Sequence, residues 1–286
     1  MVTATGNNED IHDYLKVSVE NTDLCKRYCA RMVKNIKLAP SPEWMQRRLA
    51  ASGIRPINNI VDITNYILHA YGQPLHCFDA DKIKGGKIVV KTVAEGTTFV
   101  TLDEVERKLS DKDLMICNTE EPMCIAGVFG GLDSGTTEQT VDVFLESAYF
   151  NPTWVRKTAR RHGLSTDSSF RFERGIDPNG TIYALKEAAL LVQELAGGTI
   201  SSEIKDNYPA PIADFTVELN YEKVHSLIGK TIPVETIKSI VTSLEMKIVN
   251  ETPEGLTLQV PPYRVDVQRD CDVVEDILRI YGYNNV

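Results

Sequence analysis

Glu146 is a carboxylate in a position where a globular domain ordinarily has an apolar side chain. It lies in the run VFLESAYF, which is otherwise apolar apart from Ser147. Burying an isolated carboxylate is costly unless it is paired or its pKa rises. Two interpretations are therefore open: a strand-edge glutamate that faces solvent, or a pocket carboxylate that accepts a hydrogen bond from a ligand hydroxyl.

Three other polar residues lie in or beside apolar segments. Thr64 lies near the centre of the apolar stripe of a predicted helix, and Asn65 follows about 100° further round the helix. A threonine on such a face often donates its hydroxyl to a preceding carbonyl. His76 follows a turn in GQPLHCFD, where a structural histidine is the simpler interpretation. None of the three residues indicates a functional site by itself.

A glycine-rich stretch, residues 127–131, directly follows a predicted strand. Its sequence, GVFGG, matches neither GxGxxG nor a P-loop, so it does not predict a site for nucleotide phosphates. Glycine has no Cβ, and we expect Gly130 and its neighbours to let a ligand lie against the main chain.

The segment 156–174 is basic, although the chain as a whole is acidic. It holds six Lys or Arg residues and two acids, whereas the chain has a net charge of −9. Arg156 and Arg160 are four residues apart on a predicted helix, as are Lys157 and Arg161. Such a run is commonly a solvated face. The small hydroxyl residues that follow at 165–169 favour the alternative, a contact with a phosphate backbone.

The last predicted helix carries a row of acids. Asp272, Glu275 and Asp276 are spaced i, i+3 and i+4, so they share one side, and Asp266 precedes the helix. Four oxygen donors of this kind suit Mg²⁺. The alternative is a solvated acidic face.

The first two-thirds of the chain contain both helical and strand patterns. These elements must position the residues described above. Short β runs lie between helices, which predicts an α+β domain with a mixed sheet in its middle. In chain order the predicted elements are a strand and a connecting segment over 15–37, a helix capped by Ser41 and ended by Gly53, a helix over 57–71, β runs between 87 and 150, and helices over 152–163 and 180–196.

The remaining third predicts a smaller unit. Pro209 and Pro211 suggest an extended linker over 208–214. Helices followed by a two-stranded wing resemble a winged-helix α/β module over 215–286. The predicted domains are therefore 15–207 and 215–286, preceded by a disordered or boundary segment over 1–14. The smaller unit should contain a strand at 215–219, helices over 220–228 and from Pro233, a hairpin joined at 252–255, and a helix over 270–281.

Composition predicts a cytoplasmic protein that is not held in a membrane. Of its 286 residues, 42% are hydrophobic and 25% charged, and no apolar run approaches the roughly 18 residues that a membrane span needs. The first residues are not a signal peptide. The six cysteines have neither CxxC nor zinc spacing, and we expect buried, reduced thiols.

Several long stretches, taken together, resemble the bacterial type of phenylalanyl-tRNA synthetase β subunit. The resemblance runs from about residue 15 to the end, and implies a central fragment with the family's editing domain and the winged-helix-like domain that follows it. The matching stretches are GIRPINNIVDITNY, GQPLHCFD, IAGVFGG, FLESAYF, ARRHGLSTDSSFRFERGIDP and EDILRIYGYNN.

The resemblance implies an editing site that hydrolyses tyrosine wrongly esterified to tRNA(Phe). Glu146 would read the tyrosine hydroxyl and His76 would position the attacking water, with Thr166 as a further catalytic position. Many relatives have alanine where this chain has Ser168, which implies a slightly smaller and more polar pocket. The implied substrate-binding residues are Thr64, Asn65, Gly130 and Ser168.

The same resemblance implies partners. Mg²⁺ would be held by Asp266, Asp272, Glu275 and Asp276 and shared with an α subunit in an α2β2 heterotetramer. ATP would be used by the whole complex, and this fragment alone should not charge tRNA. The basic segment, through Arg156, Arg160 and Arg161, would contact tRNA(Phe).

Two other functions remain open. One is a non-catalytic fragment that binds tRNA and scaffolds the subunits, which the acidic total and Ser168 favour but the presence of Glu146, His76 and Thr166 does not. The other is a free-standing deacylase that acts in trans, which the attached second domain disfavours.

Overall fold

The structure is a computed structural model that describes residues 3–7, 9–10, 13, 15–201 and 203–286. Residue 202 and, in the segment predicted as disordered or a boundary, residues 1, 2, 8, 11, 12 and 14 lie outside the described residues. The chain divides between Pro211 and Ile212 into two compact units. Both units mix helices with strands, which confirms the prediction of an α+β chain.

The first unit contains an antiparallel sheet in which β10 is an inner strand. The strand order is β11-β2-β10-β3, and β12 also pairs with β2. An inner strand of a covered sheet is buried on both faces, so it is nearly continuously apolar. The strands are β2 (Cys25–Lys34), β3 (Leu75–Asp79), β10 (Val143–Phe150), β11 (Thr199–Ile200) and β12 (Lys205–Asn207).

Alternate residues of β10 point to opposite faces of this sheet. The hydroxyl of Ser147 donates to the carbonyl of Thr181, 2.8 Å away on a helix that covers one face. Glu146 therefore points to the other face. The register places Glu146 between Ala30 of β2 and His76 of β3.

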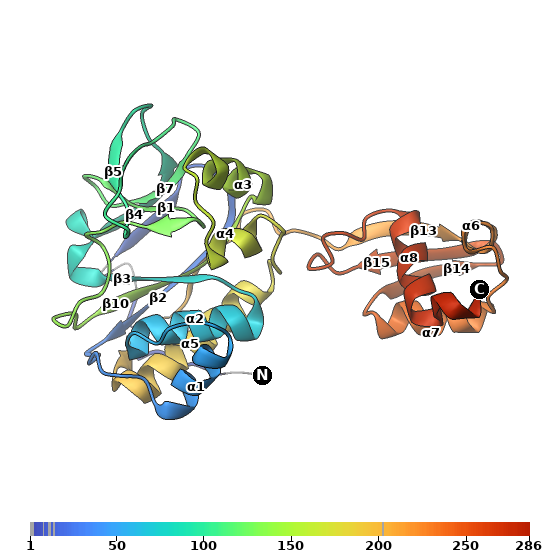
Figure 1. Ribbon diagram of the computed structural model, residues 1–286, viewed down its shortest axis with the longest axis horizontal. Coiled ribbons are helices and arrows are strands. Elements are labelled where there is room, and N and C mark those ends of the chain that lie inside the picture. The colour runs from blue at the N-terminus through green and yellow to red at the C-terminus, as the bar shows by residue number, and fades with distance from the viewer. Residues whose placement is uncertain (1–2, 8, 11–12, 14, 202) are drawn as a thin grey trace. The chain divides into compact units, whose positions relative to one another are not determined.

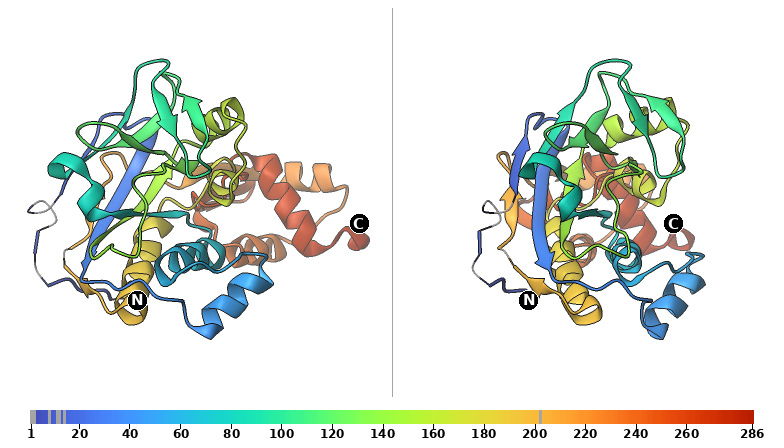
Figure 2. Two further views of the ribbon diagram at one scale, coloured as in Figure 1. Left: turned by 60° about the vertical axis from the view of Figure 1, so that its left-hand side comes forward. Right: turned by 90° about the vertical axis from the view of Figure 1, so that its left-hand side faces the viewer.

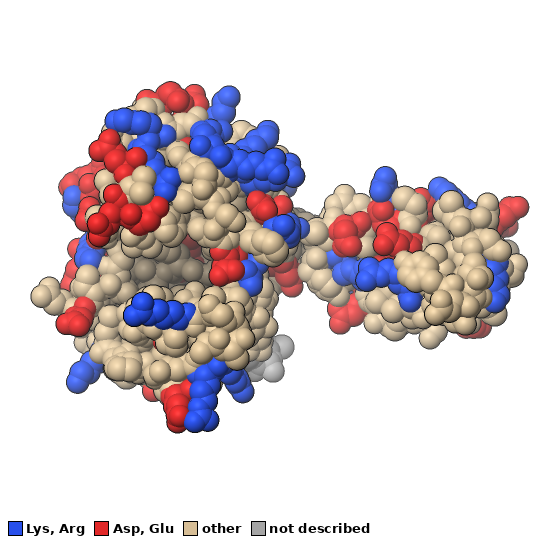
Figure 3. Space-filling view, in the orientation of Figure 1, with Lys and Arg blue, Asp and Glu red and all other residues tan. Residues whose placement is uncertain are grey.

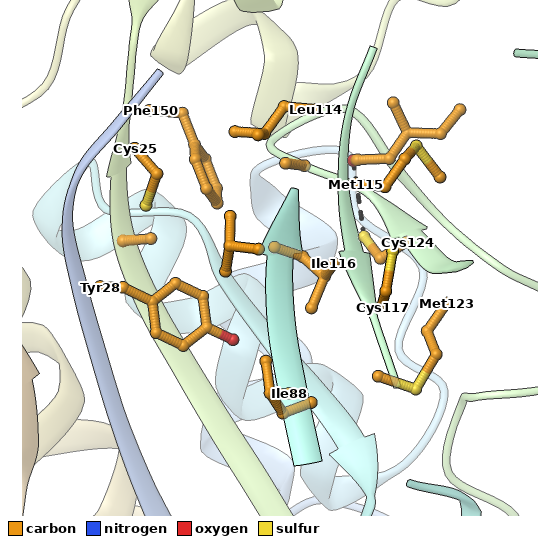
Figure 4. Close-up of a cluster of buried hydrophobic side chains, with 14 of the residues drawn as sticks. Cys25, Tyr28, Ile88, Leu114, Met115, Ile116, Cys117, Met123, Cys124 and Phe150 are labelled. Carbon is orange, nitrogen blue, oxygen red and sulfur yellow. Dashed lines mark hydrogen bonds between the residues drawn. The ribbon is translucent and has the colours of Figure 1, made fainter. Parts of the chain in front are cut away.

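A second, mixed sheet covers the face to which Glu146 points. Its order is β1-β4-β7-β8-β9, with β1 parallel to β4 and the other neighbours antiparallel. Figure 4 shows Tyr28 and Phe150 of the first sheet beside Ile88 and Ile116 of the second, within one buried cluster. The strands are β1 (Lys16–Val19), β4 (Lys87–Thr92), β7 (Leu114–Cys117), β8 (Pro122–Ile125) and β9 (Phe129–Gly130), and a separate hairpin joins β5 (Thr98–Val100) to β6 (Glu106–Lys108).

Helices cover the opposite face of the first sheet. In Figures 1 and 2, α2 and α5 lie side by side, with α1 next to α2. Ile63 and Ala188 of these helices are buried in one cluster with Val143 and Leu145 of β10. Shorter helices, α3 and α4, close the core between the two sheets. The helices are α1 (Glu43–Ala51), α2 (Asn59–Tyr71), α3 (Pro152–Arg161), α4 (Asp167–Phe172) and α5 (Gly180–Ala196).

The second unit has a three-stranded antiparallel sheet in the order β13-β15-β14. Its own core joins the sheet to three helices through Val217, Leu258, Ile237 and Val273. The predicted strands, hairpin and helices of this unit are all present. They are β13 (Phe215–Asn220), α6 (Tyr221–Ile228), α7 (Val234–Ser243), β14 (Lys247–Thr252), β15 (Gly255–Val260) and α8 (Asp270–Tyr281).

The prediction for residues 15–37 was wrong in one respect. The predicted connecting segment contains β2, a strand of ten residues at the middle of the first sheet. Two arginines interrupt its apolar pattern, yet both are buried: Arg27 forms an ion pair with Asp206 at 2.8 Å, and Arg31 is 0% exposed. Charged residues that are buried hide a strand from an argument based on hydrophobic periodicity.

Two local predictions also need correction. Ser41 does not cap α1, because Pro42 occupies the N-cap position and the Ser41 hydroxyl donates instead to the Asp62 carboxylate. The hydroxyl residues at 165–169, for which no helix was predicted, lie at the start of α4, which Thr166 caps.

The thiols and the helix lengths bear on two further expectations. All six cysteines are free, but Cys271 is exposed and Cys77 is half-buried, so the expectation of buried thiols holds for the other four. Among the helices that the structure describes, none has both the length and the apolar character of a membrane span.

Candidate functional site

A cavity of about 420 Å³ lies in the first unit next to β3, the end strand of the first sheet. Its wall comes from α2, β3, β10, the 127–130 turn and α4. Figure 3 shows the surface of this unit hollowed, with mostly uncharged side chains inside the hollow. Seven residues singled out from the sequence line this one cavity: Thr64, Asn65, His76, Gly130, Glu146, Thr166 and Ser168.

Glu146 is buried on an inner strand and is not a strand-edge residue that faces solvent. Its side chain accepts a hydrogen bond from the Tyr28 hydroxyl, with 2.6 Å between Oη and Oε2. Burial raises the pKa of Glu146 to about 7, against the opposite effect of that hydrogen bond. Near neutral pH both the acid and the carboxylate are therefore populated.

His76 lies directly across from Glu146, on the neighbouring strand. Its ring packs edge-on against Phe78, with 4.3 Å between centroids. Its Nε2 atom is buried and has no hydrogen-bond partner among the residues that the structure describes. Burial lowers the pKa of His76 to about 4, so the ring is neutral at physiological pH. A neutral ring nitrogen without a partner can accept or donate one hydrogen bond, according to its tautomer.

Gly130 leaves room for that histidine. A Cβ at this position would lie 3.0 Å from Cε1 of His76 and 2.9 Å from a methyl carbon of Leu102. Both contacts are closer than a real Cβ ordinarily makes, so a larger residue would displace the ring. The close approach that the structure shows at Gly130 is therefore toward His76 and Leu102.

The two hydroxyls at the ends of the cavity wall also have structural partners. Thr64 donates to the carbonyl of Val61 at 2.8 Å, which is the ordinary use of a helical threonine. Thr166 accepts from the amide of Ser169 at 3.0 Å and donates to the carbonyl of Val128 at 2.8 Å. Thr166 thus caps α4 and fixes it to the glycine turn. Asn65 and Ser168 are half-buried in the wall.

Tyr28 is the residue that the sequence did not reveal. It is 0% exposed and lies on β2, which was taken for a connecting segment. Had that strand been recognised, its pairing with β10 would have predicted a polar neighbour for Glu146.

The basic segment separates into two kinds of arginine. Arg156 and Arg160 are exposed on α3. Arg161 instead forms an ion pair with Asp113, whose side chain is 0% exposed and which also contacts Nε2 of His162 at 2.6 Å. Arg161 therefore has a structural partner within the first unit.

The four acids proposed for Mg²⁺ do not form a metal site in this structure. Among the described residues, no group of three or more His, Cys, Asp or Glu side chains could hold a metal ion. Asp272 is bound by Arg269, which lowers its pKa to about 2, and Asp276 pairs with Arg264. Within the described residues of this one chain, the four carboxylates therefore do not converge on one point.

The family models and the similar proteins that match this chain indicate the same family. A family model described as the B3/4 domain matches residues 24–197, and one described as the tRNA synthetase B5 domain matches residues 217–283. The chain is 76% identical over 276 residues to a protein of Bacteroides fragilis named phenylalanine–tRNA ligase β subunit. It is 57% identical over 277 residues to the protein of that name from Porphyromonas gingivalis, and 45% over 276 residues to that from Geobacter metallireducens.

These alignments cover 96% of this chain and 34% of each relative, so the chain spans about a third of their length. Among solved structures, an N-terminal fragment of the phenylalanyl-tRNA synthetase β-subunit from Pyrococcus horikoshii is 15% identical, with a TM-score of 0.43 over 98% of this chain and 77% of that chain. That likeness is too weak to carry an inference.

Replacing Arg161 should destabilise the first unit, whereas replacing Arg160 should not. Arg161→Gln removes the cation from a buried carboxylate, and we expect a loss of about 1–3 kcal/mol in the free energy of unfolding. Arg160→Gln should stay within about 0.5 kcal/mol. Urea titration followed by tryptophan fluorescence measures this unit selectively, because both tryptophans, Trp44 and Trp154, lie in it. Equal effects of the two substitutions would contradict the assignment.

Glu146 should make the first unit less stable as the pH rises. Its pKa is about 7 in the folded chain against 4.5 as the ordinary value, so the folded state holds this proton more tightly. The stability from this group is complete below about pH 4.5 and is lost as the pH rises to about 7. Relative to Glu146→Gln, the wild type should lose up to about 3 kcal/mol over that interval. Glu106→Gln, on an exposed strand, is the matched control; a pH-independent difference for Glu146→Gln would refute the prediction.

Proposed function

The chain belongs to the B3/4 domain family and also carries a tRNA synthetase B5 domain. On this premise, we propose that its cavity is the site at which tyrosine wrongly esterified to tRNA(Phe) is removed by hydrolysis. The observation that supports the proposal best is the pair at the cavity wall: a buried carboxylate, Glu146, directly across from a neutral histidine, His76, whose Nε2 has no partner. Glu146 can accept a hydrogen bond from the ligand hydroxyl, and His76 can bind a water molecule.

Physical chemistry explains why such a site would be needed. A pocket that binds phenylalanine cannot strongly reject an analogue that adds one hydroxyl, and a discrimination of roughly 10² is typical of such cases. A second site can demand the hydroxyl instead. Glu146 would accept the phenolic O–H of tyrosine, and with phenylalanine in the cavity one carboxylate oxygen would lose its partner.

The proposed reaction is attack of water on the carbonyl carbon of the aminoacyl ester, which breaks the bond to the ribose oxygen. His76 would hold the water through Nε2. Because its pKa is about 4, the ring is a weak proton acceptor at neutral pH, so it would position the water and not deprotonate it fully. A ribose hydroxyl of the tRNA would share in the proton transfer. Covalent catalysis by the protein is not part of the proposal. Burial raises the pKa of the cavity thiols Cys77 and Cys124, and the hydroxyls of Thr64 and Thr166 already donate to backbone carbonyls.

The other wall residues would give the cavity its shape. Thr64 and Asn65 of α2 would contact the amino acid from one side, and Ser168 would do so from α4. Thr166 would act by holding α4 against the glycine turn, as its two hydrogen bonds indicate. Gly130 would leave the space that both His76 and the substrate need.

The larger assembly is also a proposal. The chain would belong to a cytoplasmic phenylalanine–tRNA ligase, an α2β2 complex that uses ATP and Mg²⁺, with tRNA(Phe) as the nucleic-acid partner. Arg156 and Arg160 would contact its phosphates, with Arg161 contributing from beside its ion pair. The second unit would be a winged-helix-like module. No step in the cavity is assigned to Mg²⁺, because Asp266, Asp272, Glu275 and Asp276 do not form its site here.

Glu146→Ala should reduce the preference for tyrosyl over phenylalanyl ester. The lost charged hydrogen bond corresponds to about 1.5–3 kcal/mol, or roughly a tenfold to hundredfold fall in the ratio of the two hydrolysis rates. Both rates are measured with tyrosyl-tRNA(Phe) and phenylalanyl-tRNA(Phe), beside Glu106→Ala as the control and tryptophan fluorescence as the test of folding. An unchanged ratio would contradict the role of Glu146. A wild-type chain that binds tRNA and hydrolyses neither ester would favour the scaffolding alternative.

The double substitution Arg156→Gln/Arg160→Gln should weaken tRNA binding through its salt dependence. Each lost phosphate contact lowers the slope of log affinity against log salt by about 0.7–0.9. We therefore expect a slope reduced by about 1–2 when tRNA(Phe) is titrated at several KCl concentrations. The control is Arg47→Gln/Lys108→Gln, whose side chains are exposed elsewhere on the same unit. If both double variants change the slope equally, the α3 arginines are ordinary solvated charges.

A further inference from the structure

Tyr28 is a buried phenol whose hydroxyl reaches the carboxylate of the cavity. It is 0% exposed on β2, and it lies within the core between the two sheets with its ring between the strands (Figure 4). A buried tyrosine hydroxyl ordinarily requires a hydrogen-bond partner. The partner here is Oε2 of Glu146 at 2.6 Å, across 118 positions of sequence.

This hydrogen bond leaves the two oxygens of Glu146 unequal. Among the residues that the structure describes, Tyr28 is the one hydrogen-bond donor to this carboxylate, and it uses Oε2. Oε1 remains to accept a hydrogen bond from a molecule in the cavity, which Glu146 lines. The bond also fixes the torsion of the carboxylate, so that a single oxygen is presented to the ligand.

We propose that Tyr28 is a positioning residue for substrate selection: it favours the carboxylate over the carboxylic acid at Glu146 and presents one oxygen to a ligand phenol. The inference rests on the proposed function of the cavity. The distinction matters because a carboxylate can only accept hydrogen bonds, whereas a carboxylic acid also donates one. An acceptor-only group demands a hydroxyl from the ligand, and a carboxylic acid does not.

Among the residues that the structure describes, the groups that face Glu146 supply no positive charge that could replace Tyr28. Cys25 of β2 and Cys124 of β8 are buried thiols, and burial raises the pKa of each. His76 of β3 is neutral above pH 4. Asp167 of α4 lines the same cavity, but it is half exposed and pairs with Arg171. Burial raises the pKa of Glu146 to about 7, and the hydrogen bond from Tyr28 acts in the opposite direction.

Tyr28→Phe removes the hydroxyl and keeps the ring that packs in the core. A hydrogen bond to a charged group corresponds to about one to two pKa units. We therefore expect the pKa of Glu146 to rise by that amount, so that Glu146 is mostly protonated at pH 7. Preference for a phenol should then be lost at pH 7 and regained at higher pH.

The first measurement follows the protonation of Glu146 itself and does not depend on catalysis. The chain is labelled with ¹³C at glutamate side-chain carboxyls, and Glu146→Gln identifies the signal in a pH titration by NMR. Tyr28→Phe should move the midpoint upward by about one to two units. The matched control is Tyr221→Phe, which changes a buried phenol of the second unit whose hydroxyl has no hydrogen-bond partner in the described part of the chain. An unchanged or lower midpoint in folded Tyr28→Phe would overturn the proposal.

The second measurement tests whether the cavity binds a phenol selectively. Binding of tyrosinamide and phenylalaninamide is compared by calorimetry between pH 6 and 9. In Tyr28→Phe, the pH at which tyrosinamide becomes preferred should rise together with the titration midpoint of Glu146. In the Glu146→Gln background, Tyr28→Phe should not change the preference for tyrosinamide. A loss of preference that is independent of pH, or that persists in Glu146→Gln, would show a merely structural role and overturn the proposal.

The two proposals can fail separately. If both pH shifts appear and the chain hydrolyses neither aminoacyl-tRNA, Tyr28 retains its role in reading a phenol while the editing function is refuted. If the wild type edits tyrosyl-tRNA but Tyr28→Phe shifts neither pH value, the editing function stands and the role of Tyr28 is refuted.

Discussion

The burial of one carboxylate on an inner strand is the constraint on which the cavity depends. Glu146 lies on β10, which has strands on both sides, and only 5% of its surface is exposed. Such a group either remains protonated or needs a hydrogen-bond donor. Tyr28 is that donor, and the resulting pKa of about 7 keeps both forms of Glu146 accessible. The same burial keeps His76, the neighbour on β3, neutral.

The layers of the first unit serve this arrangement. The second sheet covers the face on which Glu146 and Tyr28 lie, while α2 and α5 cover the other. The cavity remains open where β3 ends the sheet, between α2 and the glycine turn. Thr166 fixes α4 to that turn, and Gly130 prevents a clash with His76. Thr166 and Gly130, which the sequence suggested as site residues, thus have structural roles in the cavity wall.

For the charged residues elsewhere in the chain, the ion-pair partner determines whether a side chain is available to bind a ligand. Arg160 and Arg161 are adjacent in sequence, but only Arg161 is held by a buried aspartate. Asp272 and Asp276 share a helix with Glu275, yet arginines from the preceding segment hold both aspartates. Spacing along a helix predicts which side chains share a side, and it does not reveal which counter-ions reach them.

The sequence by itself determined the α+β class, the bounds of regular elements such as α5 and α8, and seven of the residues that line the cavity. Local periodicity and contiguous motifs carry that information, because both are read over neighbouring positions. Only the tertiary structure decided that β2 is a strand, that Tyr28 donates to Glu146, that His76 is neutral and that Arg161 is paired. Each of these depends on burial or on a contact between residues far apart in the chain. Such contacts leave no periodic pattern, since the free energy of a buried charge depends on which groups surround it in space.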